Sequence, residues 1–201
     1  MIINNIEYND VLFILIPKTA SRSIYLPLNR KKIDNWKRVA ISKHDSYNML
    51  TENNEIGENV FKFAVVRNPY TRAYSYFEHF NLINRLNFCF KEFLDVVSKG
   101  KCDIDIITKM IYYNQSFYVH NYDGNIAVTK LYRFENLEKV EQDLNIILER
   151  HHIGKYTIDN YHTAYDKEAI DMVKHIYIDD FNNFNYSTEF DSNFEFSKHK
   201  Y

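Results

Sequence analysis

Two short apolar runs at residues 11–16 and 61–66 constrain the fold of this chain more than any other feature. Both are close to continuously apolar and rich in β-branched or aromatic residues, which predicts strands. Such runs are typical of strands buried on both faces of a parallel sheet. A third run at residues 128–134 predicts another strand.

Helical patterns separate the three runs. They lie at residues 23–31, 45–52, 69–83, 90–98, 104–113, 135–150 and 167–181. Pro27 is expected to limit or kink the first helix, Asp45 to cap the second, and Pro69 to open the third. Alternating strands and helices predict an α/β domain with a mainly parallel sheet, whose ligands bind beyond the carboxyl ends of the strands. We expect one domain at residues 1–187 and a C-terminal tail at 188–201.

Composition sets the class of protein and its compartment. The formal net charge is −2, so no strong field draws the chain to nucleic acid or to an anionic membrane. The two cysteines, Cys89 and Cys102, lie in no CxxC or Cys/His cluster, which favours a reducing compartment and argues against structural zinc. We find no signal peptide and no membrane-spanning run. These features predict a cytoplasmic protein, and they do not predict an oligomeric state.

The polar segment "IPKTASRS" follows the first apolar run and predicts an anion site. Backbone N–H groups at a helix N-terminus carry partial positive charge and bind phosphate. The hydroxyls of Thr19, Ser21 and Ser23 add donors, and Lys18 and Arg22 add charge. The alternative interpretation is a capped helix start, with Ser21 as the cap and two solvated cations.

The second polar segment lies in "FKFAVVRNPYTRAYSYFEHF", directly after the run at 61–66. Arg67 is expected to project from the carboxyl end of the strand, where a guanidinium makes forked contacts with phosphate. Ser75 lies eight residues later and returns to the same helical face. The alternative for Arg67 is a structural salt bridge. Arg72 is expected to be solvated or ion-paired.

Taken in order, these two segments resemble the 5′-phosphosulfate loop and the 3′-phosphate motif of sulfotransferases. These enzymes use 3′-phosphoadenosine 5′-phosphosulfate (PAPS) as the sulfuryl donor. The "PKTAS" form is similar to the heparan sulfate 2-O-sulfotransferases of the carbohydrate branch. "LYRFENLEKVEQDL" and "VKHIYIDDFNNFNYS" resemble that family's third strand with its helix and its closing helix, so the similarity covers residues 11–187. The resemblance implies a P-loop-like fold with a central, mainly parallel sheet flanked by helices, and no metal.

The resemblance also assigns roles to individual residues. It implies that the 5′-phosphosulfate is held by Pro17, Lys18, Thr19, Ala20, Ser21, Arg22 and Ser23. It implies that Arg67 and Ser75 hold the 3′-phosphate. Ala20 occupies a position where many relatives have Gly, and Arg22 departs from the usual small or hydroxyl residue. Because negative charge grows on the departing 5′-phosphate, Lys18 is the candidate that stabilises the transition state.

An acceptor hydroxyl needs a general base, most often His or a carboxylate. In members similar to the 2-O-sulfotransferases, a His between the two nucleotide motifs serves as the base, and His44 in "SKHDSYNML" occupies that region. The alternative is a surface histidine at a helix start. His79, one turn beyond Ser75, is the second candidate for the base. His162 in "NYHTAY" is expected in a loop that lines the acceptor or adenine side.

The leading hypothesis is a sulfotransferase that moves a sulfuryl group from PAPS to an acceptor hydroxyl, on a carbohydrate or another small molecule. A second hypothesis is a nucleotide- or glycan-binding module that has the fold without turnover. A third is a nucleotide kinase, which fits poorly because GxxxxGK[ST] needs glycines and no Gly precedes Gly57.

Overall fold

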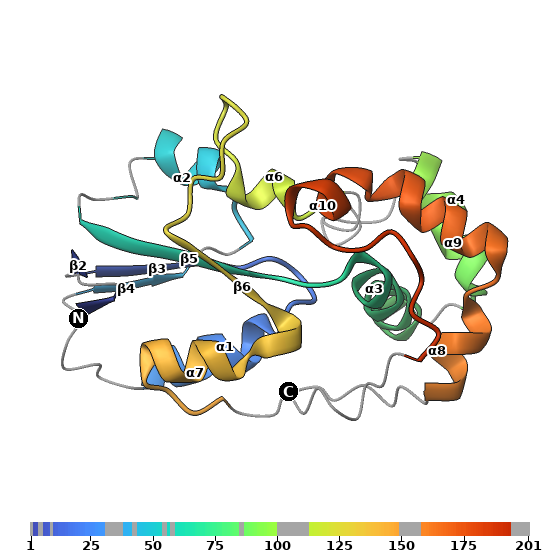
Figure 1. Ribbon diagram of the computed structural model, residues 1–201, viewed down its shortest axis with the longest axis horizontal. Coiled ribbons are helices and arrows are strands. Elements are labelled where there is room, and N and C mark those ends of the chain that lie inside the picture. The colour runs from blue at the N-terminus through green and yellow to red at the C-terminus, as the bar shows by residue number, and fades with distance from the viewer. Residues whose placement is uncertain are drawn as a thin grey trace. The chain divides into compact units, whose positions relative to one another are not determined.

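The computed structural model describes residues 2–3, 6–8, 10–30, 38–41, 44–53, 56, 59–84, 87–99, 113–148 and 158–193 of the chain (Figure 1). It divides into two compact units. The sheet unit comprises Met1–Val66 and Phe117–His151 with Tyr201, and the helical unit comprises Arg67–Ser116 and His152–Lys200. The elements in chain order are β1 (Ile2–Ile3), β2 (Ile6–Glu7), β3 (Asp10–Ile14), α1 (Ser21–Arg30), β4 (Arg38–Ile41), α2 (Tyr47–Glu52), β5 (Val60–Val66), α3 (Pro69–Asn84), α4 (Phe90–Lys99), α6 (Ser116–Val119), β6 (Lys130–Arg133), the 3₁₀-helix η1 (Phe134–Asn136), α7 (Glu138–Leu144), α8 (Ile158–Ala164), α9 (Lys167–Ile176) and α10 (Ile178–Asn183).

The main sheet has the strand order β4-β3-β5-β6, and every neighbouring pair is parallel. The prediction of an α/β fold with a parallel sheet is therefore confirmed. The three predicted strands correspond to β3, β5 and β6. The edge strand β4 was not predicted, because its four residues, "RVAI", give too short a pattern. A separate antiparallel pair, β1 and β2, was also not predicted.

One face of this sheet carries the core of the sheet unit. Phe13 of β3 stacks on Phe63 of β5 with ring centroids 4.6 Å apart, and Tyr132 of β6 meets Phe63 edge-on. Ile24 of α1 and Val140 of α7 are fully buried in the same cluster, so these two helices cover that face (Figure 1). Burying one such side chain stabilises the fold by about 1.5–3 kcal/mol.

The other face of the sheet is buried as well. Leu12 and Ile14 alternate with Val11 and Phe13 along β3, and all four are buried. This pattern confirms the prediction of strands buried on both faces. Figure 1 shows α2 on the side of the sheet opposite α1 and α7.

Several helix boundaries differ from the sequence prediction. The second helix is capped by Ser46, whose hydroxyl accepts a hydrogen bond from the Met49 amide, so the assignment of Asp45 as the cap was wrong. α1 runs on through Pro27 to its end at Arg30. The helix predicted over 104–113 lies outside the described residues, except for Tyr113.

Two predicted helices are shorter than their apolar patterns. α7 ends where Asn145 adopts a left-handed conformation, with φ 49°, rather than continuing to residue 150. The pattern over 167–181 is divided at Tyr177 into α9 and α10. Both interruptions depend on local backbone geometry, to which apolar spacing is insensitive.

The helical unit packs around tyrosine and phenylalanine side chains. Tyr70 of α3 meets Tyr165 edge-on with ring centroids 5.5 Å apart, and the Tyr165 hydroxyl donates to the Tyr70 carbonyl at 2.6 Å. Phe190, beyond α10, packs against the same tyrosines. Figure 1 shows α4 alongside α9. None of the described helices of the protein has the length and apolar character that a membrane crossing requires.

Candidate functional site

The turn after β3 has an unusual backbone. Lys18 has φ 67° and Ala20 has φ 63°, both in the left-handed region that favours glycine, whereas Thr19 between them lies outside it. A left-handed conformation costs a residue with a side chain roughly 1–2 kcal/mol. Backbone of alternating hand turns successive N–H groups toward one side and forms a concavity that binds anions. The turn has this alternation without any glycine.

Two hydroxyls hold the turn in place. Thr19 Oγ1 donates to the Ile16 carbonyl at 2.8 Å, and Ser21 Oγ donates to the same carbonyl at 2.7 Å. Thr19 is fully buried. In this arrangement each hydroxyl proton is used within the turn, so direct donation to a phosphosulfate requires release from Ile16. The role of these hydroxyls toward a ligand stays a prediction.

Helix α1 begins directly after the turn. Its first backbone hydrogen bond joins the Ile24 amide to the Ala20 carbonyl at 3.2 Å, which makes Ala20 the N-cap and Ser21 the first helical residue. The alternative interpretation of Ser21 as the cap was therefore wrong. In any α-helix the amides of the first turn have no acceptor within the helix. Of the side chains in this turn, Ser23 is buried and Arg22 is exposed.

His44 contacts the start of the same turn. Its Nδ1 lies 3.0 Å from the Leu15 carbonyl, although the two residues are 29 positions apart. A carbonyl only accepts hydrogen bonds, so Nδ1 must carry the proton, and in the neutral ring Nε2 is then the acceptor. His44 also has φ 71°, in the left-handed region. The structure thus brings the predicted base to Leu15, which lies between β3 and the predicted loop.

The second polar segment follows β5, which is the parallel neighbour of β3. Arg67 comes directly after this strand and is 4% exposed, and its Nε donates to Thr71 Oγ1 at 2.9 Å. Thr71 and Ser75 lie on α3 and are also buried. Thr71 and Ser75 are four residues apart on α3 and share one helical face, and Arg67, which precedes the helix, reaches this face through its contact with Thr71. Sequence analysis missed Thr71, although this spacing pointed to it.

A buried amide side chain holds the backbone of Arg67. The Arg67 amide donates to Gln115 Oε1 at 2.8 Å, and Gln115 Nε2 donates to the Arg67 carbonyl at 2.8 Å. Gln115 is fully buried and lies 48 residues further along the chain. Sequence analysis missed Gln115, because no spacing rule connects residues so far apart.

A second arginine of α3 has a different environment. Arg72 Nη1 lies 3.6 Å from Asp180 Oδ2, and both side chains are buried. The Arg72 guanidinium also donates to the Tyr76 hydroxyl and the Tyr113 carbonyl, each at 3.2 Å. Burial raises the pKa of Asp180, and the charge of Arg72 opposes that rise. Arg72 is ion-paired, as one of the two predicted alternatives proposed.

The remaining candidates lie on helices. His79 is half-buried on α3, four residues beyond Ser75. His162 lies on α8 beside the Tyr161 ring, so its assignment to a loop was wrong.

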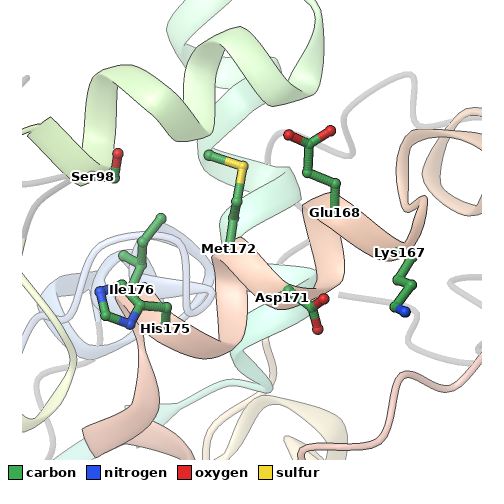
Figure 2. Close-up of a pocket in the computed structure, with 7 residues that line it drawn as sticks. All are labelled: Ser98, Lys167, Glu168, Asp171, Met172, His175 and Ile176. Carbon is green, nitrogen blue, oxygen red and sulfur yellow. The ribbon is translucent and has the colours of Figure 1, made fainter.

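A hollow of about 590 Å³ lies between α4 and α9 in the helical unit. Figure 2 shows Ser98 on α4 and the other lining residues on α9. None of them was predicted as a site residue. Glu168 is ion-paired with Lys91 at 3.1 Å, and Met172 and Ile176 pack on the aromatic core. These three lining side chains therefore have partners within the protein.

The predicted residues thus form two groups. The turn at 17–23 and His44 belong to the sheet unit, and Arg67 and Ser75 belong to the helical unit. Comparison of the chain with models of known protein families, with curated proteins and with solved structures finds no match.

Proposed function

We propose that this protein is a PAPS-dependent sulfotransferase with a P-loop-like fold, which transfers a sulfuryl group to a carbohydrate hydroxyl. The observation that carries the proposal is the hydrogen bond from His44 to the carbonyl of Leu15, which directly follows β3 and lies three residues before the left-handed Lys18. It supports a general base beside an anion-binding loop, which is the pairing that sulfuryl transfer requires. The neighbouring strand β5 leads directly into Arg67, a second group suited to phosphate.

At the donor end, the turn after β3 binds the 5′-phosphosulfate. The backbone N–H groups of the turn and the first turn of α1 supply hydrogen bonds, and Lys18 supplies the positive charge. As the S–O bond to the phosphate breaks, negative charge grows on the 5′-phosphate. One preorganised donor aimed at such charge is worth roughly 10²–10³ in rate.

At the acceptor end, His44 acts as the general base. The acceptor oxygen forms the new bond to sulfur, and its proton passes to Nε2 of His44. The hydrogen bond from Nδ1 to the Leu15 carbonyl fixes the tautomer that this transfer needs. General base catalysis of this kind contributes about 10²–10⁴ in rate.

The 3′-phosphate binds to the face formed by Arg67, Thr71 and Ser75. A guanidinium makes forked hydrogen bonds to phosphate oxygens, and a hydroxyl adds a further donor. The burial of all three side chains supports this role, because a charge-assisted hydrogen bond is stronger away from water. These three side chains therefore distinguish PAPS from nucleotides that lack a 3′-phosphate.

A thermal-shift comparison of two ligands tests the proposal. Adenosine 3′,5′-bisphosphate at 100 times its Kd stabilises the protein by about 2.7 kcal/mol, which raises Tm by roughly 5–10 °C. ATP with Mg²⁺ is expected to raise Tm less. Lys18→Ala should lose most of the bisphosphate response, whereas Lys139→Ala, which removes an exposed lysine of α7, should keep it.

Transfer of sulfur-35 from labelled PAPS to a panel of glycans and small metabolites then tests catalysis. We expect label on a carbohydrate hydroxyl. A larger Tm response to ATP with Mg²⁺ would contradict the proposal and favour a kinase. Bisphosphate binding without transfer to any acceptor would favour a binding module instead.

A further inference from the structure

The backbone of Arg67 is paired on both sides by one side chain. Its N–H donates to Gln115 Oε1 and its carbonyl accepts from Gln115 Nε2, each at 2.8 Å. This double exchange is the one that two hydrogen-bonded residues make in an antiparallel sheet. β5 ends one residue earlier, at Val66. The primary amide of Gln115 therefore takes the place of a strand partner where the strand has ended.

Gln115 is itself fixed by a buried carboxylate. The backbone N–H of Gln115 donates to Asp180 Oδ2 at 2.8 Å, and the backbone N–H of Ser116 donates to Asp180 Oδ1 at 2.9 Å. Gln115 and Asp180 are both fully buried, and Arg72 balances the carboxylate charge at 3.6 Å. The carboxylate thus holds the backbone of Gln115. A buried side-chain amide that lost its two bonds to the Arg67 peptide would leave unsatisfied polar groups, so those bonds hold its rotamer.

The side chain of Arg67 has an anchor of its own. Its Nε donates to Thr71 Oγ1 at 2.9 Å, in a contact that is buried. Gln115 therefore fixes the backbone end of the residue, and Thr71 fixes the guanidinium end. Two anchors of this kind set the direction of a planar group that binds only within a narrow range of angles.

We propose that Gln115 is a positioning residue for Arg67 and, through it, determines the preference for nucleotides with a 3′-phosphate. The inference rests on the proposed function, because it takes Arg67 as the 3′-phosphate ligand. Gln115 touches the peptide of Arg67 rather than the nucleotide. Its loss should therefore weaken only those ligands whose binding uses the guanidinium of Arg67.

The experiment compares two nucleotides by isothermal titration calorimetry. Adenosine 3′,5′-bisphosphate carries the phosphate that Arg67 would bind, and adenosine 5′-monophosphate lacks it. Gln115→Met keeps the length of the side chain and removes both hydrogen bonds to Arg67. We expect Kd for the bisphosphate to rise on the order of tenfold, as when an outer partner of a ligand-binding group is lost. Kd for the monophosphate should change less than about twofold.

A matched control separates this effect from a general loss of stability. Asn81 lies on α3, about 15 Å from Thr71 along the helix axis. Asn81→Ala removes a hydrogen bond of 2.9 Å from this side chain to the Phe88 carbonyl. This variant should change Kd for both nucleotides by the same factor. In the double variant Gln115→Met with Arg67→Ala, the bisphosphate should bind no more weakly than with Arg67→Ala alone.

The outcomes distinguish a failure of the proposed function from a failure of the role of Gln115. A wild-type protein that binds both nucleotides equally would contradict the role of Arg67, and with it the proposed function. A wild-type protein that prefers the bisphosphate, together with an unchanged preference in Gln115→Met, would overturn the inference alone. If Gln115→Met fails to fold, Gln115→Glu replaces it. That variant keeps the acceptor for the Arg67 amide and loses the donor, and an unchanged preference would again overturn the inference.

Discussion

The polar segments after β3 and after β5 follow neighbouring parallel strands, yet they are held in opposite ways. The turn after β3 is shaped by its own backbone, with left-handed residues at Lys18 and Ala20 and two neutral hydroxyls on one carbonyl. The segment after β5 is shaped by buried side chains, in which Gln115 pairs with Arg67 and is held by Asp180.

The difference shows which kind of site a sequence reveals. The two hydroxyl hydrogen bonds within the first turn join residues three and five positions apart. The bonds that hold Arg67 and Gln115 join residues 48 and 65 positions apart. The residues of a locally held turn stand side by side in the sequence and can be recognised together. In the long-range network, only the arginine could be recognised from the sequence.

The largest expected effect is that of replacing His44, and it tests which of the two regions supplies the catalytic base. His44→Asn keeps a donor at the position of Nδ1, and Asn tolerates the left-handed backbone at this residue. It removes Nε2, so sulfuryl transfer should fall by roughly 10³ with little change in Kd for adenosine 3′,5′-bisphosphate. Steady-state turnover and calorimetry on the same preparations measure both quantities.

The matched variant is His79→Gln, on helix α3 of the other unit. It should retain turnover near that of the wild type, because we assign His79 no proton transfer. The opposite result, with turnover lost in His79→Gln and kept in His44→Asn, would contradict His44 as the general base. It would assign that role to His79 on α3.

The fold follows the same division between local and long-range information. The apolar runs predicted β3, β5 and β6, and the first two runs also predicted the burial of β3 and β5 on both faces, because alternate residues of a strand point to opposite faces. Strand β4 was not predicted, since four residues are too few to show an apolar periodicity. Its place at the sheet edge comes from pairing with β3. The start of α3 at Pro69 was predicted because Pro suits the first turn of a helix.

The candidate site was predicted in part for the same reason. Lys18, Thr19 and Ser21 stand together in the sequence, and the structure places them in one turn with left-handed backbone at Lys18 and Ala20. Gln115 and Asp180 could not be predicted, because a buried polar pair carries no periodic signal.

A substitution of intermediate effect tests whether the first turn depends on its backbone. Ala20 has φ 63°, so Ala20→Gly should relieve roughly 1–2 kcal/mol of strain and add about 0.5–1 kcal/mol of backbone entropy to the unfolded chain. The net result is a free energy of unfolding raised by about 0.5–1 kcal/mol. Ala73→Gly, in the interior of helix α3, should instead lower it by about 1 kcal/mol. Urea unfolding measures both, and a loss of stability in Ala20→Gly would contradict the left-handed turn.

The smallest expected effect follows from the charged cap of α9 in the helical unit, in contrast with the neutral hydroxyls of the turn. Asp166 caps α9 and accepts a hydrogen bond from the Ala169 amide at 2.9 Å. That bond, together with Lys91, lowers the pKa of Asp166 below its ordinary value of 3.8. A lowered pKa means that the folded state binds the proton less readily than the unfolded state, so the stabilisation is present above pH 3.8 and is lost as pH falls through the lowered pKa.

Hydrogen exchange at the Ala169 amide should therefore lose protection in acid sooner than exchange at the Ile24 amide, whose acceptor is the Ala20 carbonyl and which has no titrating partner. Asp166→Asn keeps an acceptor and removes the charge, and should flatten the acid response at Ala169 without changing that at Ile24. If both amides lose protection at the same pH in the wild type, the two regions open together. The contrast between a turn held by neutral groups and a helix start capped by a carboxylate would then not extend to their stability.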